Sequence, residues 1–355
     1  YTRKPPEGSK TNPIFHYALF VEMAAKACAD DQELLDELLH GMNVTGDIGK
    51  SGVWPAAEPG ECMSDDDWRR TAPEERRKLI AKVFAGKHDT AASKTIWEKT
   101  LEEASQGYCK GPFYTEEEVT AVIGDEHWVP TPRFPLVQGD KVRSIDAGNL
   151  SRVNELAAIC EKLELPSTDL AIVCIRELLH LLGGDATAAS KLRSWVLDEE
   201  NAYRGIGIHP TQKRYAVIAM QDPTGKVAFF QMVGHAFGWT AAVYNFNRRA
   251  RLKQQLLGKL FLLPCFSYYD DTFGFETDDI IDIAEKCVRE VHELLGIPYG
   301  EHKVKVGPRV DILGVAYNLP KLKVHITKKR RKALLIELQH ILHTNKLSPG
   351  NAGKL

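Results

Sequence analysis

Apolar residues recur at helical spacing in the first part of the chain. Leucines repeat through residues 33–40 and stop at Gly41, and Thr71-Ala72-Pro73-Glu74-Glu75 combines a cap, an early proline and first-turn acids, as at a helix start. Residues 46–66 lie between these patterns and are rich in Gly, Pro and acidic residues, which predicts a loop. We therefore expect residues 1–110 to form a mostly helical N-terminal extension.

The middle of the chain predicts two helices and a hairpin. Residues 153–165 and 169–182 carry apolar positions at helical spacing. Residues 215–220 and 227–233 are typical of strands, and the turn-forming residues 221–225 lie between them. An antiparallel hairpin is therefore expected after the two helices.

The C-terminal half alternates strand and helix patterns. An amphipathic helix is predicted at 277–295, because its apolar residues share one face and Gly296 follows. The other elements predicted here are strands at 261–266, 272–276, 310–319 and 322–326, and a helix at 328–343. Helices mixed with antiparallel hairpins predict an α+β fold.

Composition places the chain in a broad class. The 355 residues are 43% hydrophobic, which is enough for two or three globular units, and no apolar stretch reaches membrane-spanning length. Seven scattered cysteines without a CxxC pair argue against a disulfide framework and a zinc finger. We expect a soluble, intracellular protein, cytoplasmic or nuclear, with no membrane partner. Since the chain begins without Met, we interpret it as a piece of a longer polyprotein.

Positive charge is clustered although the net charge is only -2. Every charged residue from 321 to 332 is basic, and a second basic run follows residue 247, with the members Arg248, Arg249, Arg251 and Lys253. Such clusters are typical of a track for a phosphate backbone. A solvated helix face explains either run alone equally well.

Two adjacent carboxylates stand between two predicted strands, in the sequence Tyr268-Tyr269-Asp270-Asp271. Like charges this close repel and raise each other's pKa, so a bound cation would explain the pair. Magnesium is suitable, because it takes oxygen ligands from one or two carboxylates and keeps positions for water and phosphates. A hairpin turn is the simpler explanation for the Asp pair taken alone.

A third carboxylate, Asp198, ends the apolar run Trp195-Val196-Leu197. If that strand lies beside the hairpin, three carboxylates converge at one edge of a sheet. They can then hold two metal ions, which clamp the attacking and leaving oxygens of a phosphoryl transfer.

These acids belong to an ordered series of motifs along the chain. The series is Leu197-Asp198 with Ala202-Tyr203, then Phe237-Gly238, then Tyr268-Tyr269-Asp270-Asp271, then Leu313-Gly314. In order and spacing it resembles the palm motifs of retroelement and retroviral reverse transcriptases, over residues 110–355. The resemblance implies a right-hand polymerase with fingers at 111–190 and 210–236, a palm at 191–209 and 237–320 whose antiparallel sheet packs on helices, and the start of a thumb or connection at 321–355.

The implied function is template-directed DNA synthesis by two-metal nucleotidyl transfer, as part of a retroelement polyprotein. An RNA-directed DNA polymerase of this kind copies RNA and also DNA templates from a DNA primer, using deoxynucleoside triphosphates. By resemblance, Asp198, Asp270 and Asp271 are the catalytic ligands of two Mg²⁺ ions, which Mn²⁺ can replace. The backbone carbonyl of Glu199 is a further expected metal ligand.

The resemblance also implies roles for residues around the acids. Tyr203 would form a wall under the sugar that excludes a 2′-hydroxyl, and Lys141 and Arg143 would meet the triphosphate, as suits charged phosphate partners. The remaining expected roles are support of the template base and nucleotide by Phe237 and Gly238, a primer grip at Leu313 and Gly314, and protonation of pyrophosphate by Lys303 or Lys305.

Two other functions stay open. One is a catalytically inactive, domesticated relative that binds RNA or a protein, and the other is an RNA polymerase of the same architecture. Asn201 and the extra acids Glu199-Glu200 depart from the common family pattern without removing a metal ligand. The sequence leaves open the type of element, any downstream ribonuclease H or integrase domain, the oligomeric state and the mode of initiation.

Overall fold

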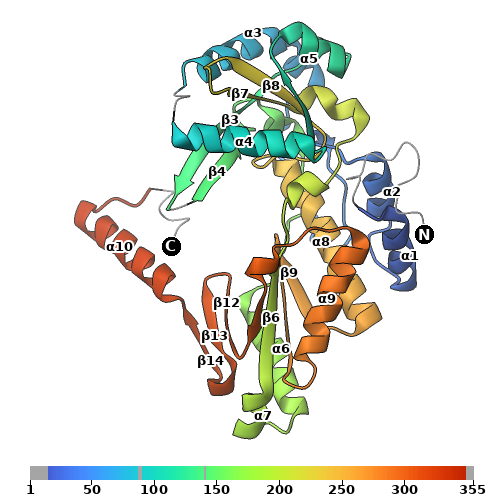
Figure 1. Cartoon of the computed structure of the whole chain (residues 1–355), viewed down its shortest axis with the longest axis vertical. Helices are drawn as coiled ribbons and strands as arrows, with labels where there is room; N and C mark the ends of the chain where they lie inside the picture. The colour runs from blue at the N-terminus through green and yellow to red at the C-terminus, as the bar shows by residue number, and fades with distance from the viewer. Residues whose placement is uncertain (1–14, 87–89, 140, 349–355) are drawn as a thin grey trace.

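The computed structural model describes residues 15–86, 90–139 and 141–348, and Figure 1 shows the whole chain. It is a mixed α/β structure with several sheets. The two larger sheets have the strand orders β11-β6-β10-β9 and β2-β8-β7-β3-β4. The long helix α8 (Thr240–Phe261) runs from the five-stranded sheet along one side of the four-stranded sheet (Figure 1).

The four-stranded sheet is antiparallel throughout. Its strands alternate side chains between two faces, as strands must. Trp195 and Leu197 pack with α8 and α9 (Ile281–Leu295), whereas Val196 and Phe273 pack with α6 (Thr168–Leu181). The strand bounds are Leu192–Asp198 for β6, Cys265–Tyr268 for β9, Asp271–Thr277 for β10 and Lys305–Gly307 for β11.

The five-stranded sheet lies with helices α3, α4 and α5 (Figure 1). Trp68 of α3 and Trp97 of α4 are buried in one core with Phe230 of β8. The helices are α3 (Asp65–Phe84), α4 (Ala91–Ser105) and α5 (Glu116–Ile123). The strands are β2 (Cys109–Phe113), β3 (Thr131–Gln138), β4 (Lys141–Asp146), β7 (Val217–Gln221) and β8 (Val227–Met232).

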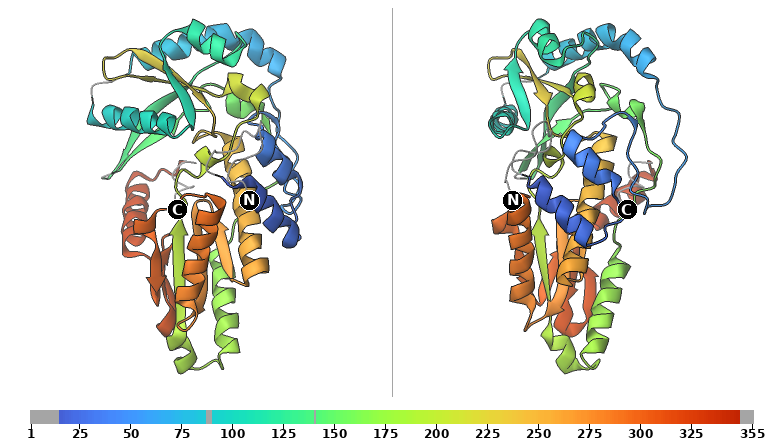
Figure 2. Two further views of the ribbon diagram at one scale, coloured as in Figure 1. Left: turned by 45° about the vertical axis from the view of Figure 1, so that its right-hand side comes forward. Right: turned by 90° about the vertical axis from the view of Figure 1, so that its right-hand side faces the viewer.

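Smaller elements complete the fold. The three-stranded sheet consists of β12 (Arg309–Ile312), β13 (Val315–Asn318) and β14 (Lys323–Ile326), and it leads into α10 (Lys328–Thr344). None of the described residues of α10 is buried, and the helix extends away from the four-stranded sheet in Figures 1 and 2. The short remaining elements are β1 (Gly46–Asp47), β5 (Ala157–Ala158) and α7 (Ala186–Lys191).

The helices of the first hundred residues contribute to both large cores. Helices α1 (Tyr17–Lys26) and α2 (Glu33–His40) pack beside α8, in the core that contains Trp195, as Figure 2 shows. Helices α3 and α4 instead pack on the five-stranded sheet. These residues are mostly helical, as the sequence predicts, and residues 1–14 and 349–355, which the predictions also cover, lie outside the described part of the chain.

Several predicted elements are confirmed. The amphipathic pattern at 277–295 forms α9, the pattern at 169–182 forms α6, and the predicted hairpin forms β7 and β8. The helix predicted at 328–343 is α10. In each case the apolar period or the cap residue that predicts the element also determines it locally.

The helix predicted at 153–165 is wrong. The structure has a single 3₁₀ turn, Val153–Leu156, followed by β5, which pairs in parallel with β1. Glu161 accepts hydrogen bonds from the backbone N–H and the hydroxyl of Ser51, at 2.8 and 2.9 Å. The segment is extended because residues far away in the N-terminal part supply its backbone and side-chain partners, which a local pattern does not reveal.

Three predicted boundaries also differ from the structure. Helix α3 begins at Asp65, where Ser64 accepts a hydrogen bond from the Asp67 N–H, so Pro73 lies inside the helix rather than at its start. Helix α8 continues to Phe261, so the strand predicted at 261–266 begins later and is β9, Cys265–Tyr268. The strand predicted at 310–319 is two strands, because Leu313 and Gly314 have positive φ and reverse the chain.

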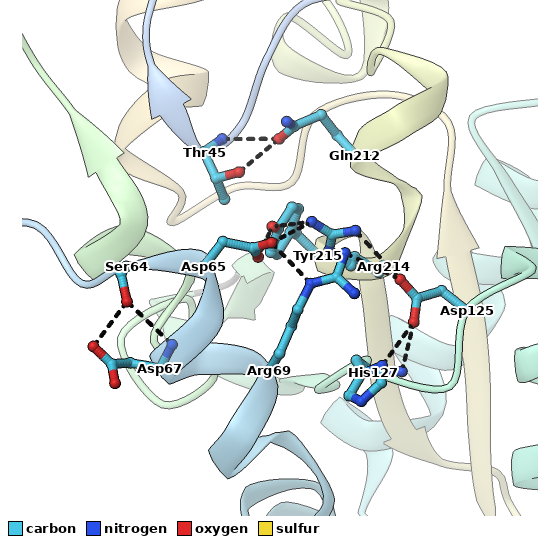
Figure 3. A network of polar contacts seen from close by, with 10 residues as sticks. All are labelled: Thr45, Ser64, Asp65, Asp67, Arg69, Asp125, His127, Gln212, Arg214 and Tyr215. Atoms are coloured by element: carbon cyan, nitrogen blue, oxygen red, sulfur yellow. Dashed lines mark hydrogen bonds and ion pairs between the residues drawn. The ribbon is translucent and has the colours of Figure 1, made fainter.

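An ion network anchors α3 to the residues before β7 (Figure 3). Arg214 donates to Asp65 at 2.8 Å and to Asp125 at 3.2 Å, and Arg69 donates to Asp65 at 2.8 Å. Burial alone would raise the pKa of Asp65, but hydrogen bonds from Tyr215 and Arg69 and the charge of Arg214 hold it below its ordinary value. The network therefore fixes the start of α3 against the segment that precedes β7.

Among the helices in the described ranges, none combines the length and the apolar character needed to cross a membrane.

Candidate functional site

Asp198 and Asp271 are direct register partners on the adjacent antiparallel strands β6 and β10. They extend from the same face of the sheet as Val196 and Phe273, because side chains alternate along each strand. Directly opposed residues on one face have Cβ atoms about 4.5–5.5 Å apart. The Glu199 N–H donates to the Asp270 carbonyl at 2.8 Å, which brings Asp270 to the same edge. The predicted convergence of these three residues is therefore present.

The hairpin that carries Asp270 has an unusual backbone. Asp271 and Tyr268 are paired, so Tyr269 and Asp270 form a two-residue turn. Tyr269 has a φ of 51°, a conformation that bulky residues rarely adopt. Such strain is typical of functional sites, where the surrounding structure holds it.

The carboxylates at this edge repel one another. Burial raises the pKa of Asp271 to about 6, helped by the charges of Asp270 and Asp198. Burial also raises the pKa of Asp270, again with the charge of Asp198, while Lys303 and Arg143 oppose the rise. The negative charges at this edge of the sheet are therefore only partly compensated by nearby cations.

Lys303 supplies part of that charge. Its ammonium donates to Asp198 Oδ2 at 2.5 Å and is 39% exposed. No group of three or more His, Cys, Asp or Glu side chains in the described ranges is arranged to hold a metal ion. Magnesium needs only one or two carboxylates, however, and Asp198 and Asp271 present paired hard oxygens. The donor set fits this ion once Lys303 releases Asp198. The Lys303 ammonium occupies, in this structure, the place that the positive charge of the metal would take.

The side chain of Glu199 lies in the interior, away from this edge. It is buried and forms ion pairs with Arg249 and Lys253 of α8. Lys253 also donates to Thr272 Oγ1 at 3.1 Å and to His292 Nε2 at 3.0 Å. Lys253 thus links Glu199, the residue after Asp198, to Thr272, the residue after Asp271. The cluster therefore holds the two paired acids in place from the interior side of the sheet.

The prediction that Arg248, Arg249 and Lys253 form a surface track for phosphate is wrong. All three are buried, and Arg248 donates to Asp31 at 2.8 and 2.9 Å and also binds Glu37. Their acidic partners belong to α2, the loop before it and the residue that follows β6, so the run is internal. The apolar residues between these cations are buried too, which is the signal that could have indicated an internal helix.

Tyr203 lies close to the acidic edge. Its ring packs edge-on against Phe237 and Phe246, with centroid distances of 4.9 and 5.3 Å. Burial raises the pKa of Tyr203 to about 12, and the charge of Asp270 contributes. Phe237 stays 38% exposed, so one aromatic surface faces outward beside the acids.

The backbone conformation and close packing at Gly238 require a glycine. Its φ is +95°, and a Cβ atom there would lie 2.2 Å from the carbonyl oxygen of Asp146. The close approach is therefore to the backbone of β4. Phe237 is held in place by this contact between the two segments.

The predicted phosphate-binding residues lie on β4, which pairs with β3 in a hairpin. Lys141 and Arg143 are both exposed. The charge of Arg143 acts on Asp270, so the hairpin reaches toward the acidic edge. The structure thus brings Arg143, Tyr203 and the acids into one electrostatic neighbourhood.

Leu313 and Gly314 form the turn between β12 and β13, with φ of 53° and 77°. Arg330 of α10 donates to the Leu313 carbonyl at 2.8 Å, and the Thr327 N–H donates to the Gly314 carbonyl at 3.1 Å. Lys305, the alternative to Lys303, is exposed on β11 and pairs in register with Val196. The turn is therefore attached to the basic start of α10.

A buried ion network was not assigned from the sequence. Arg133 of β3 donates to Asp146 of β4 at 2.6 and 3.0 Å and to Glu103 of α4 at 2.9 Å. Arg204, next to Tyr203, donates to the same two carboxylates. Burial alone would raise the pKa of Asp146, but Arg133 and Arg204 hold it below its ordinary value. Only the fold brings these four elements together, so no local pattern marks them.

A scan against protein-family models found no match, and a search of curated proteins found no match either.

Proposed function

We propose that the chain is an RNA-directed DNA polymerase that joins deoxynucleotides to a DNA primer on an RNA or DNA template. The observation that carries the proposal is the register pairing of Asp198 with Asp271, with Asp270 at the same edge. In this proposal the four-stranded sheet is a palm, the five-stranded sheet belongs to the fingers, and α10 begins a thumb. The ordered motifs of the sequence support the same assignment.

Each residue of the site has a task in this reaction. Asp198 and Asp271, with Asp270 beside them, would hold magnesium, which when bound supplies positive charge against the phosphate oxygens and activates the primer hydroxyl. Arg143 would bind the triphosphate, and Lys303 would donate a proton to the leaving pyrophosphate. Little covalent chemistry is required of the protein, because positioning and charge stabilisation lower the barrier in phosphoryl transfer.

The sugar would be selected by an aromatic surface. Tyr203 and Phe237 pack on each other beside Asp270, and Phe237 is partly exposed. A ring under C2′ leaves no room for a hydroxyl, so deoxynucleotides are favoured. This feature supports a DNA polymerase over an RNA polymerase of similar architecture.

A second candidate function is binding of RNA or a protein without catalysis. The ion pair between Lys303 and Asp198 supports it, because that ammonium satisfies the carboxylate without a metal. A pure binder has no use for the other two acids, however, and their pKa values are raised by burial and mutual repulsion. We therefore place this function second.

Primer extension tests the proposal. An oligo(dT) primer on a poly(rA) template is incubated with dTTP and Mg²⁺, using the parent chain, Asp271→Asn and the control Asp282→Asn on the exposed surface of α9. The parent and the control should extend the primer, and Asp271→Asn should be slower by at least about a thousandfold, as expected for a lost metal ligand. No extension by the parent, or equal extension by Asp271→Asn, would refute catalysis at this site.

A further inference from the structure

The guanidinium group of Arg204 donates hydrogen bonds from all three of its nitrogens and also packs on an aromatic ring. Nη2 donates to Asp146 at 3.1 Å, Nε donates to Glu103 at 3.0 Å, and Nη1 donates to the carbonyl of His235 at 2.7 Å. Its flat face lies over the ring of Phe237, 4.9 Å from the centroid. The side chain is fully buried. Only a planar fork with several fixed donors can make these contacts together.

These contacts connect the proposed aromatic surface to the strand that carries Arg143. Tyr203 precedes Arg204 in the chain and packs on the same Phe237 ring that the guanidinium covers. The Asp146 side chain binds Arg204, and its carbonyl contacts Gly238. Asp146 also ends β4, the strand that carries Arg143. One ion pair thus connects the aromatic surface to the hairpin with the phosphate-binding residue.

We propose that Arg204, held by Asp146, is a positioning residue that sets the place of Tyr203 and Phe237 and so determines the discrimination between deoxynucleotides and ribonucleotides. The proposal rests on the proposed polymerase function and names a residue that acts on sugar selection at that site. Arg204 acts through Tyr203 and Phe237 and does not itself touch the nucleotide.

The physical reason is the precision that steric exclusion requires. A 2′-hydroxyl is rejected by contact with a ring, so a ring shifted by about 1 Å gives up much of the selection. A lysine at position 204 has one ammonium group and cannot reach three acceptors on three elements. It would leave a buried carboxylate or carbonyl without its donor, and the aromatic pair would lose the flat surface that supports it.

The experiment compares the ratio of kcat/KM for a deoxynucleotide and the matching ribonucleotide in the parent chain and in Arg204→Lys. The ratio should fall by at least about tenfold, mainly through a lower KM for the ribonucleotide, because its 2′-hydroxyl then meets less steric exclusion. Arg214→Lys is the matched control, because Arg214 makes a similar set of ion pairs in the network of Figure 3. The ratio should stay unchanged in this control.

A second variant, Glu103→Gln, keeps the test decisive if Arg204→Lys folds poorly. Glu103→Gln weakens the network at its 15% exposed rim while keeping an acceptor, and it should lower the ratio by about threefold in a chain that still unfolds in one cooperative transition. Where Arg204→Lys does fold, adding it to Tyr203→Ala should lower the ratio no further, because the ring that Arg204 positions under the sugar is already gone.

The outcomes separate this inference from the function on which it rests. A parent chain that extends primers, with an unchanged ratio in folded Arg204→Lys or in Glu103→Gln, would overturn the inference and leave the polymerase proposal standing. A parent chain that incorporates neither nucleotide would overturn both.

Discussion

The ammonium of Lys303 donates to Asp198 at 2.5 Å, so one lysine occupies the place where a cation would neutralise the paired acids. Lys305, two residues later, is exposed on β11. The contact therefore favours Lys303 over Lys305 as the proton donor of the proposed reaction, a choice that the sequence leaves open.

Replacing these two lysines separately tests this assignment. In single-turnover primer extension, Lys303→Gln should slow nucleotide addition by about a hundredfold, a typical loss when a positioned proton donor is removed. Lys305→Gln should change the rate by less than about threefold. The reverse order, or equal effects, would assign the proton donor elsewhere.

The buried cluster behind the acids makes a prediction about stability. Lys253→Met should lower the free energy of unfolding by about 3 kcal/mol, because Glu199 then loses one of its two cationic partners in the interior. Adding Glu199→Gln should cost less than the sum of the two single changes, since the residues are coupled. Denaturant unfolding at pH 6 is suitable, because burial and the charge of Arg249 lower the pKa of Lys253 to about 7.

The exposed Lys286→Met on α9 is the control for this cycle and should change stability by less than about 0.5 kcal/mol. Strictly additive effects of Glu199→Gln and Lys253→Met would show that the two side chains do not form the ion pair.

The helices and strands of this fold can be predicted from the sequence better than the contacts between them. The apolar run that ends at Asp198 and the segment that begins at Asp271 are strands because of their own residues, so the sequence alone predicts where these acids stand. The basic run at 248–253 has a similar local appearance to the one at 328–332, yet the first is buried and the second is exposed. The difference lies in Asp31, Glu37 and Glu199, which reach α8 only in the folded chain.

Some residues around the acids can likewise be predicted from the sequence, and others cannot. The motif residues near the acids could be found because each has a distinctive side chain at a strand end or turn. Arg204 and Asp146 could not, since an arginine beside a tyrosine and an acid at the end of a strand are ordinary features. They form a network only through ion pairs with Glu103 and Arg133, which lie on elements distant in sequence.

The carboxyl group of Glu276 predicts a pH dependence of stability. It is buried on β10, and its register partner Arg193 pairs with Asp278 instead. Burial, helped by the charge of Asp279, raises the pKa of Glu276 from 4.5 to about 7. Because the folded state holds this proton more tightly, its stabilising contribution is complete below about pH 4.5 and is lost as the pH rises through about 7.

Melting temperatures of the parent chain and Glu276→Gln should therefore differ with pH. The variant should become the more stable protein as the pH rises from 5 to 8, by about 2 °C at pH 8. Glu117→Gln on the exposed surface of α5 should follow the parent at every pH. Parallel curves for Glu276→Gln and the parent would exclude a shifted carboxyl group at this position.

The exposed start of α10 predicts how the chain holds nucleic acid. Lys328 and Lys332 are exposed on this helix, which is attached to the Leu313-Gly314 turn through Arg330. If the helix follows a phosphate backbone, reversing both charges should weaken binding of an RNA–DNA duplex at least about tenfold. It should also reduce the slope of log affinity against log salt by about 2, since each lost phosphate contact removes close to one counterion. Fluorescence anisotropy at several salt concentrations measures both quantities.

The matched control reverses Lys26 and Lys286, two exposed lysines on α1 and α9 that each pair with a glutamate four residues away. It changes the net charge by the same amount, so a general electrostatic effect would appear in both proteins. A loss of affinity and of salt slope confined to the α10 variant would assign the basic helix to the nucleic acid. Equal behaviour of the two variants would show that the run from 328 to 332 is only a solvated helix face.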